Sequence, residues 1–158
     1  MPDNRDLVRL VKVPIAVAIV VTLVRVAVEL MGAPNAVVMV FGVAWLHILF
    51  PIYFASRIVA LGFEKPFMTL FKATVMWALP VRVIVAGTYV LGYVMQIDSL
   101  RFEAESLGPL GEGITPIQGY LLLPLANFAS WMVLAVILAA ITGGITLAIR
   151  KRSAAIAA

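Results

Sequence analysis

The chain has 158 residues, of which 63% are hydrophobic and 13% are charged, and its mean hydropathy is +1.08. A soluble domain of this length could not bury so much apolar surface, and the absence of cysteine excludes disulfides and thiolate metal sites. The net charge of +4 does not indicate nucleic-acid binding, because the basic residues are spread between apolar stretches in a way that indicates membrane orientation instead.

Four long apolar stretches follow one another at residues 7–31, 36–61, 67–95 and 117–149. Each exceeds the roughly 20 residues that an α-helix needs to cross about 30 Å of hydrocarbon. Runs such as residues 15–21 do not alternate between apolar and polar side chains, so the strands of a membrane β-barrel are excluded. We therefore expect residues 1–158 to form one all-α integral membrane domain. Short turns between the first three stretches predict a bundle of four transmembrane helices that runs up-down-up-down.

The first stretch, 7–31, carries Arg25 and Glu29 one helical turn apart on the same face. A charged side chain at the middle of a membrane helix costs about 2.5–3.5 kcal/mol on insertion scales, so such residues need a partner. The spacing predicts an ion pair within the helix.

The second stretch, 36–61, contains His47 near its middle, followed by Pro51. A single histidine in a helix is either a hydrogen-bonded packing residue or a ligand. We expect no cofactor. The alternative is haem b or a quinone, and haem b would need a second axial ligand from a methionine or another subunit.

The third stretch, 67–95, places Arg82 close to its middle, two residues after Pro80. We expect Arg82 to reach towards Glu29 or Asn127, or else to extend to water or bond carbonyl groups that the proline leaves free.

Glu29 is the only acidic residue inside a predicted span, so at least one positive charge among Arg25, Arg82 and His47 is unbalanced. This excess predicts an anionic group in the same half of the bundle, such as a lipid phosphate, a quinone head group or an acidic side chain of a partner subunit.

The connection 96–116 carries a single basic residue, Arg101, among four acidic residues, and it is the largest predicted surface outside the membrane. It is either a docking site for a partner or a solvated acidic loop. The fourth stretch, 117–149, follows it.

Small residues at four-residue spacing, Ala135, Ala139 and Gly143, form a stripe along the fourth stretch that lets another helix approach closely, inside the bundle or in another subunit. We expect the stripe to pack inside. Prolines at positions 51, 80 and 124 predict bends in the second, third and fourth helices.

Basic residues gather at alternate ends of the stretches: at the N-terminus (Arg5, Arg9, Lys12), around the second connection (Arg57, Lys65, Lys72) and in the C-terminal tail (Arg150, Lys151, Arg152). The positive-inside rule places all three groups, and thus both termini, in the cytoplasm. The size of the chain favours a bacterial inner (plasma) membrane.

No catalytic or metal-binding motif is present in the sequence. We therefore expect a non-catalytic accessory or structural subunit of a larger membrane complex, or a homo-oligomer, with membrane lipid and other membrane subunits or itself as partners. One alternative is a small transporter or channel that uses His47, Arg82 and proline-bent helices. Another is a redox subunit that binds haem b or a quinone through His47.

Overall fold

The computed structural model describes residues 4–156, which form helices and turns and contain no β-strand. The first helix, α1, covers Asn4–Leu30, and a continuous helix, α4, covers Pro66–Met95. Between them the chain forms α2 (Asn35–Val40), a 3₁₀ turn η1 (Val43–Trp45) and α3 (Leu46–Ala60). Two 3₁₀ turns, η2 (Leu100–Phe102) and η3 (Ala104–Ser106), follow α4. The last part comprises the π-helical turn η4 (Gln118–Leu122), α5 (Leu123–Leu138), the π-helical turn η5 (Ala139–Gly143) and α6 (Gly144–Ile156).

Four helical segments are long and apolar enough to cross a membrane: Arg5–Leu30, Asn35–Ala60, Pro66–Met95 and Gln118–Ser153. They confirm the four predicted spans, with boundaries that differ by a few residues. Large apolar side chains remain exposed on every segment, as on Val20 (59%), Leu79 (48%) and Val133 (62%). Such a surface suits contact with lipid and indicates a multi-pass membrane protein.

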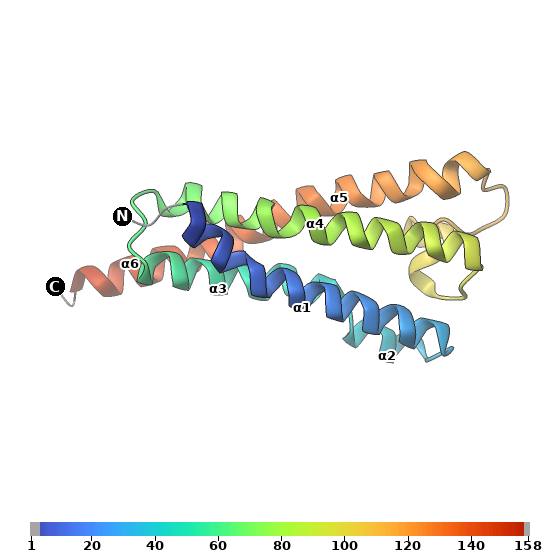
Figure 1. Ribbon diagram of the computed structural model, residues 1–158, viewed down its shortest axis with the longest axis horizontal. Coiled ribbons are helices and arrows are strands. Elements are labelled where there is room, and N and C mark those ends of the chain that lie inside the picture. The colour runs from blue at the N-terminus through green and yellow to red at the C-terminus, as the bar shows by residue number, and fades with distance from the viewer. Residues whose placement is uncertain (1–3, 157–158) are drawn as a thin grey trace.

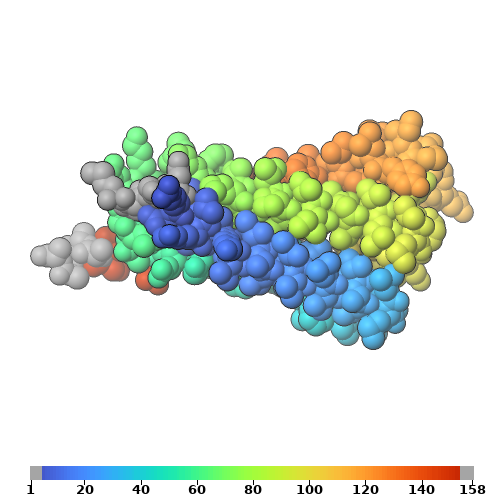
Figure 2. Space-filling model, in the orientation of Figure 1, coloured from blue at the N-terminus to red at the C-terminus, as the bar shows by residue number. Residues whose placement is uncertain are grey.

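The molecule is long and narrow, and the start of α1 and the end of α6 lie at the same end of its long axis (Figure 1). We call this the terminal end, and we call the opposite end, which holds residues 31–34 and 96–116, the loop end. Helix α4 packs against both α1 and α5, while α3 packs against α4, η5 and α6. Towards the loop end, α1 and α2 diverge from α4 and α5. On the face shown in Figure 2, α1 and α4 lie against each other along most of their length.

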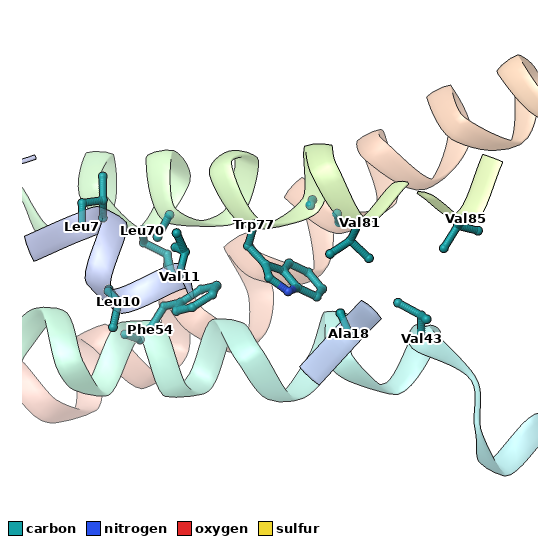
Figure 3. Packing of buried hydrophobic residues seen from close by; sticks show 14 of the residues in the cluster. Leu7, Leu10, Val11, Ala18, Val43, Phe54, Leu70, Trp77, Val81 and Val85 are labelled. Atoms are coloured by element: carbon teal, nitrogen blue, oxygen red, sulfur yellow. The ribbon is translucent and has the colours of Figure 1, made fainter. Parts of the chain in front are cut away.

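Apolar side chains fill the terminal-end half of the bundle. Trp77 of α4 is fully buried there and packs edge-on against Phe50 and at a longer distance against Phe54 (Figure 3). Its indole Nε1 donates a hydrogen bond of 3.2 Å to the carbonyl oxygen of Pro14, which links α4 to α1. The buried charged side chains of the spans, Glu29 and Arg82, lie on the loop-end side of this apolar packing.

The stripe of small residues lies inside the chain, since Ala135, Ala139 and Gly143 are all buried. A Cβ atom at Gly143 would lie 2.8 Å from Cδ2 of Leu70 and 3.0 Å from the carbonyl oxygen of Pro51. The stripe therefore brings η5 against α3 and α4, as expected for packing within the bundle.

The assigned helices continue through Pro51 and Pro80, and Pro124 stands in the first turn of α5, directly after η4. Bending of the helix axes at these prolines stays a prediction. The interruption of the second span lies elsewhere, at residues 41–45, where α2 has ended at Val40 and the chain passes through Gly42 in an extended conformation. This break sets the start of α3 near the middle of the bundle.

Candidate functional site

The loop-end half of the bundle encloses a cavity of about 270 Å³. Three arginines line it: Arg25 of α1, Arg82 of α4 and Arg101 of η2. We therefore call it the arginine cavity. Its remaining walls include Val43 from the break in the second span and Trp131 from α5.

Arg82 and His47 form a buried pair across α4 and α3, with exposed fractions of 3% and 0%. The guanidinium Nη2 lies 2.9 Å from His47 Nε2, while His47 Nδ1 lies 3.0 Å from the carbonyl oxygen of Val43. A carbonyl oxygen only accepts and a guanidinium only donates, so Nδ1 carries the proton and Nε2 offers its lone pair. His47 is therefore a neutral imidazole that orients Arg82 without balancing its charge.

The Arg82 guanidinium also stacks on the ring of Trp131, with 4.3 Å between its Cζ atom and the ring centroid. A cation–π contact of this kind contributes on the order of 0.5–2 kcal/mol, which does not offset the burial of an arginine in a membrane. Within residues 4–156, no carboxylate pairs with Arg82, and its Nη1 atom makes no hydrogen bond although it lines a cavity. Arg82 thus carries a buried charge that the described part of the chain leaves uncompensated.

Glu29 is the acidic centre of the loop end, and its side chain has no exposed surface. Arg101 binds it through two parallel hydrogen bonds, Nε to Oε1 at 2.6 Å and Nη2 to Oε2 at 2.5 Å. Arg25 adds a bond from Nε to Oε1 at 3.1 Å, and Ser99 donates to the same oxygen at 3.2 Å. The predicted pair of Arg25 and Glu29 is confirmed, and the stronger, bidentate partner comes from the segment 96–116.

Arg101 is held on the bundle by further contacts. Its Nη1 donates to the hydroxyl oxygen of Thr88 at 3.0 Å, and its guanidinium lies over the ring of Phe102, at 4.2 Å. Burial lowers the pKa of Arg101, while the hydrogen bond and the charge of Glu29 act to raise it. An arginine stays protonated at neutral pH under such influences.

Of the five polar residues predicted from the sequence, Arg25, Arg82 and Asn127 line this cavity. Glu29 and His47 do not line it but contact its arginines, Glu29 through Arg25 and His47 through Arg82. Arg82 contacts His47 and Trp131, not Glu29 or Asn127 as expected. Asn127 instead donates a hydrogen bond of 3.0 Å from Nδ2 to the hydroxyl oxygen of Tyr89. The sequence reasoning missed the role of Arg101. The available signal was that it is the only basic side chain in an otherwise acidic segment.

Among the described residues, the only carboxylate that pairs with any of the three guanidiniums lining the cavity is that of Glu29, so these four side chains have a net charge of +2. The break in the second span adds to the positive character, because Val43 and Ala44 of η1, the helical turn that leads into α3, line the cavity and no side chain caps this turn. The free N–H groups of a helix N-terminus carry partial positive charge. The cavity therefore favours an anion.

Comparison of the chain with protein-family models, curated proteins and solved structures finds no match. Groups of three or more histidine, aspartate or glutamate residues that could hold a metal ion do not occur among residues 4–156. Both ring nitrogens of His47 are engaged, Nδ1 with Val43 and Nε2 with Arg82, so neither is free for an axial bond to haem iron.

Proposed function

We propose that this chain is a non-catalytic multi-pass membrane protein that binds an anionic group in the arginine cavity. Arg82 carries this proposal. It is 97% buried, since 3% of its surface is exposed, and it faces a cavity with no acidic partner among the described residues. An anion at this position would replace the missing counter-ion and accept charge-assisted hydrogen bonds from the free Nη1 atom.

The proposed topology is up-down-up-down with both termini in the cytoplasm, in a bacterial inner membrane. It is supported by the charge of the connections: Arg57, Lys65 and Arg150 belong to segments at the terminal end, while residues 31–35 contain no basic side chain. In this orientation the arginine cavity lies in the outer half of the bundle.

The proposed role is that of an accessory or structural subunit of a larger membrane assembly, or of a homo-oligomer. It is supported by the absence of catalytic motifs from the sequence and by the small extramembrane mass. Lipid and other membrane subunits, or further copies of the chain, would cover the apolar surface. Size analysis of the protein extracted in a mild detergent tests this role, and a monomer that carries neither lipid nor protein would contradict it.

Anion binding is tested by removing lipid from the purified protein and adding back an anionic or a neutral phospholipid, with the bound lipid counted by native mass spectrometry. We expect the anionic lipid to bind and the neutral lipid to bind at least about tenfold more weakly. The reason is that the cationic head group of a neutral phospholipid offsets its phosphate, so only the anionic lipid brings a net negative charge to Arg82. Arg82→Gln should remove the difference. The control is Arg57→Gln, which neutralises an exposed arginine at the terminal end. Equal binding of the anionic lipid by Arg82→Gln and by the unmodified protein would contradict the proposal.

The break at residues 41–45 favours a second candidate, a small transporter or channel. Interrupted helices whose ends face a cavity near the middle of the membrane occur in transporters, and here the start of α3 lies beside Arg82. Anion flux into liposomes that contain the protein tests this candidate. Flux that is abolished by Arg82→Gln and retained in Arg57→Gln would establish it over passive binding.

A further inference from the structure

We propose that the anion of the arginine cavity is the phosphomonoester head group of a lipid whose acyl chains leave the bundle between α2 and α5. This inference rests on the proposed function, since it names the chemical class of the anion that the cavity binds. Three observations carry it: the charge of the cavity, the hydrogen-bond donors that remain free, and the direction in which the cavity opens.

The charge of +2 selects a dianion. A phosphodiester carries one negative charge, as does a carboxylate, whereas a phosphate monoester carries about −1.5 to −2 at neutral pH. A monoanion would leave one buried guanidinium unbalanced in a region where each uncompensated charge is costly. A monoester balances Arg25 and Arg82 together, while Glu29 stays paired with Arg101.

The donors that remain free belong to the same two arginines and to Tyr89. Arg82 has Nη1 available, and Arg25 uses only Nε in its hydrogen bond with Glu29, which leaves both of its Nη atoms. The hydroxyl of Tyr89 accepts a hydrogen bond from Asn127, so its own proton can be donated. All three side chains line the cavity, and together they match the three terminal oxygens of a phosphomonoester.

The cavity is lined on two sides by α2 and α5, so we infer that it opens towards lipid between these two helices. Its wall contains Val38 and Met39 of α2 and Trp131 of α5, yet α2 packs against α1 and not against α5. Figure 1 shows these two helices on opposite sides of the diverging loop end. Met39, the lining residue at the end of α2, is apolar and 60% exposed. An apolar opening between two membrane spans can hold acyl chains, whereas a free phosphate ion would gain no favourable contact from it.

The test compares three probes on the delipidated protein by native mass spectrometry: phosphatidic acid, which is a monoester, phosphatidylglycerol, which is a diester, and inorganic phosphate. We expect phosphatidic acid to bind about tenfold more tightly than phosphatidylglycerol and inorganic phosphate to compete weakly. Arg82→Gln should bring the two lipids to similar affinities. Arg82→Lys keeps the charge but not the forked arrangement of donors, so it should retain part of the preference for phosphatidic acid. Arg57→Gln should retain all of that preference.

The outcomes separate this inference from the proposed function. Equal affinities for the two lipids in the unmodified protein would overturn the monoester, while binding of both that depends on Arg82 would still support an anion site. Inorganic phosphate that binds as tightly as phosphatidic acid would overturn the route for acyl chains. Failure of all three probes to bind would overturn the proposed function itself. Size-exclusion chromatography first checks that each variant elutes at the same volume as the unmodified protein. If Arg82→Gln does not fold, Arg82→Lys takes its place.

Discussion

The Glu29 carboxylate accepts four hydrogen bonds, one from Arg25, one from Ser99 and two from Arg101, and it has no exposed surface. It thereby joins α1 to the segment 96–116, which is far away in the sequence. Among residues 4–156, this carboxylate is the only acceptor that two arginines share, so their positions depend on its charge.

Glu29→Gln should therefore destabilise the protein by about 3 kcal/mol, since it removes the negative member of a buried ion-pair cluster and leaves the guanidiniums unbalanced. Chemical unfolding in detergent micelles measures the change. Glu105→Gln is the control, because it makes the same substitution at an exposed position of the same segment. If the free energy of unfolding decreases by the same small amount in both variants, the positions of Arg25 and Arg101 do not depend on this carboxylate.

At the residue scale, the sequence predicted local pairs and not distant ones. Arg25 and Glu29 are four positions apart, so helix geometry alone brings them together. Arg101 is separated from Glu29 by 72 positions and reaches it only because the segment 96–116 folds back onto the bundle. Arg82 lies near the middle of α4, but a position along a helix does not say which neighbouring helix a side chain faces, and Arg82 faces His47 on α3.

At the element scale, one glycine holds the segment 96–116 in place. The ring of Phe102 is fully buried against Gly92 of α4, where a Cβ atom would lie 2.6 Å from the ring atom Cε1. Only a residue without a side chain permits this contact. The position of Phe102 in turn sets that of Arg101, its neighbour in the chain.

Gly92→Ala should displace Phe102 and loosen the segment, with a loss of about 1–3 kcal/mol of stability as in other overpacked sites. Cleavage of residues 96–116 by an added protease, measured together with thermal unfolding, reports both effects. Gly87→Ala is a matched control on the same helix, since no atom lies within 4 Å of the Cβ position there. It should be neutral or slightly stabilising, because alanine favours a helix over glycine. Equal protease resistance of the two variants would refute the proposed role of Gly92.

Two neighbouring glycines, Gly143 and Gly144, test the packing of the small-residue stripe. Gly143→Ala places a methyl group 2.8 Å from Leu70 and 3.0 Å from the backbone oxygen of Pro51, which cannot move without shifting α3. We expect a loss of about 1–3 kcal/mol. Gly144→Ala meets no atom within 4 Å and should have little effect. Thermal unfolding measures the loss of stability in the two variants. A larger loss for Gly144→Ala than for Gly143→Ala would place the stripe against another subunit.

The elements themselves were largely predictable, because hydropathy and length determine which segments can span a membrane. The break at residues 41–45 was not predicted. The sequence predicted bends at the prolines and no interruption, and α3 and α4 do continue through Pro51 and Pro80. A single glycine after Phe41 gives no comparable signal in a sequence with 11 glycines, and the break becomes intelligible only beside the charges of the arginine cavity.

At the scale of the whole molecule, the two halves of the bundle differ in character. The terminal-end half packs around Trp77 with apolar side chains, and the loop-end half diverges around a cavity with a charge of +2. The positive connections lie at the terminal end, so the proposed topology would place the cavity in the outer leaflet. A lipid bound there would enter from that leaflet.

Because the chain contains no cysteine, single cysteines report its orientation without background. In intact cells, a thiol reagent that does not cross membranes should label Glu105→Cys, which lies in the exposed part of the segment 96–116. Lys65→Cys, exposed between α3 and α4 at the terminal end, should be labelled only after the membrane is permeabilised. The physical reason is that translocating Arg57, Lys65 and Lys72 together is disfavoured, whereas the segment 96–116 has a net negative charge. Labelling of Lys65→Cys in intact cells would reverse the orientation and move the arginine cavity to the cytoplasmic leaflet.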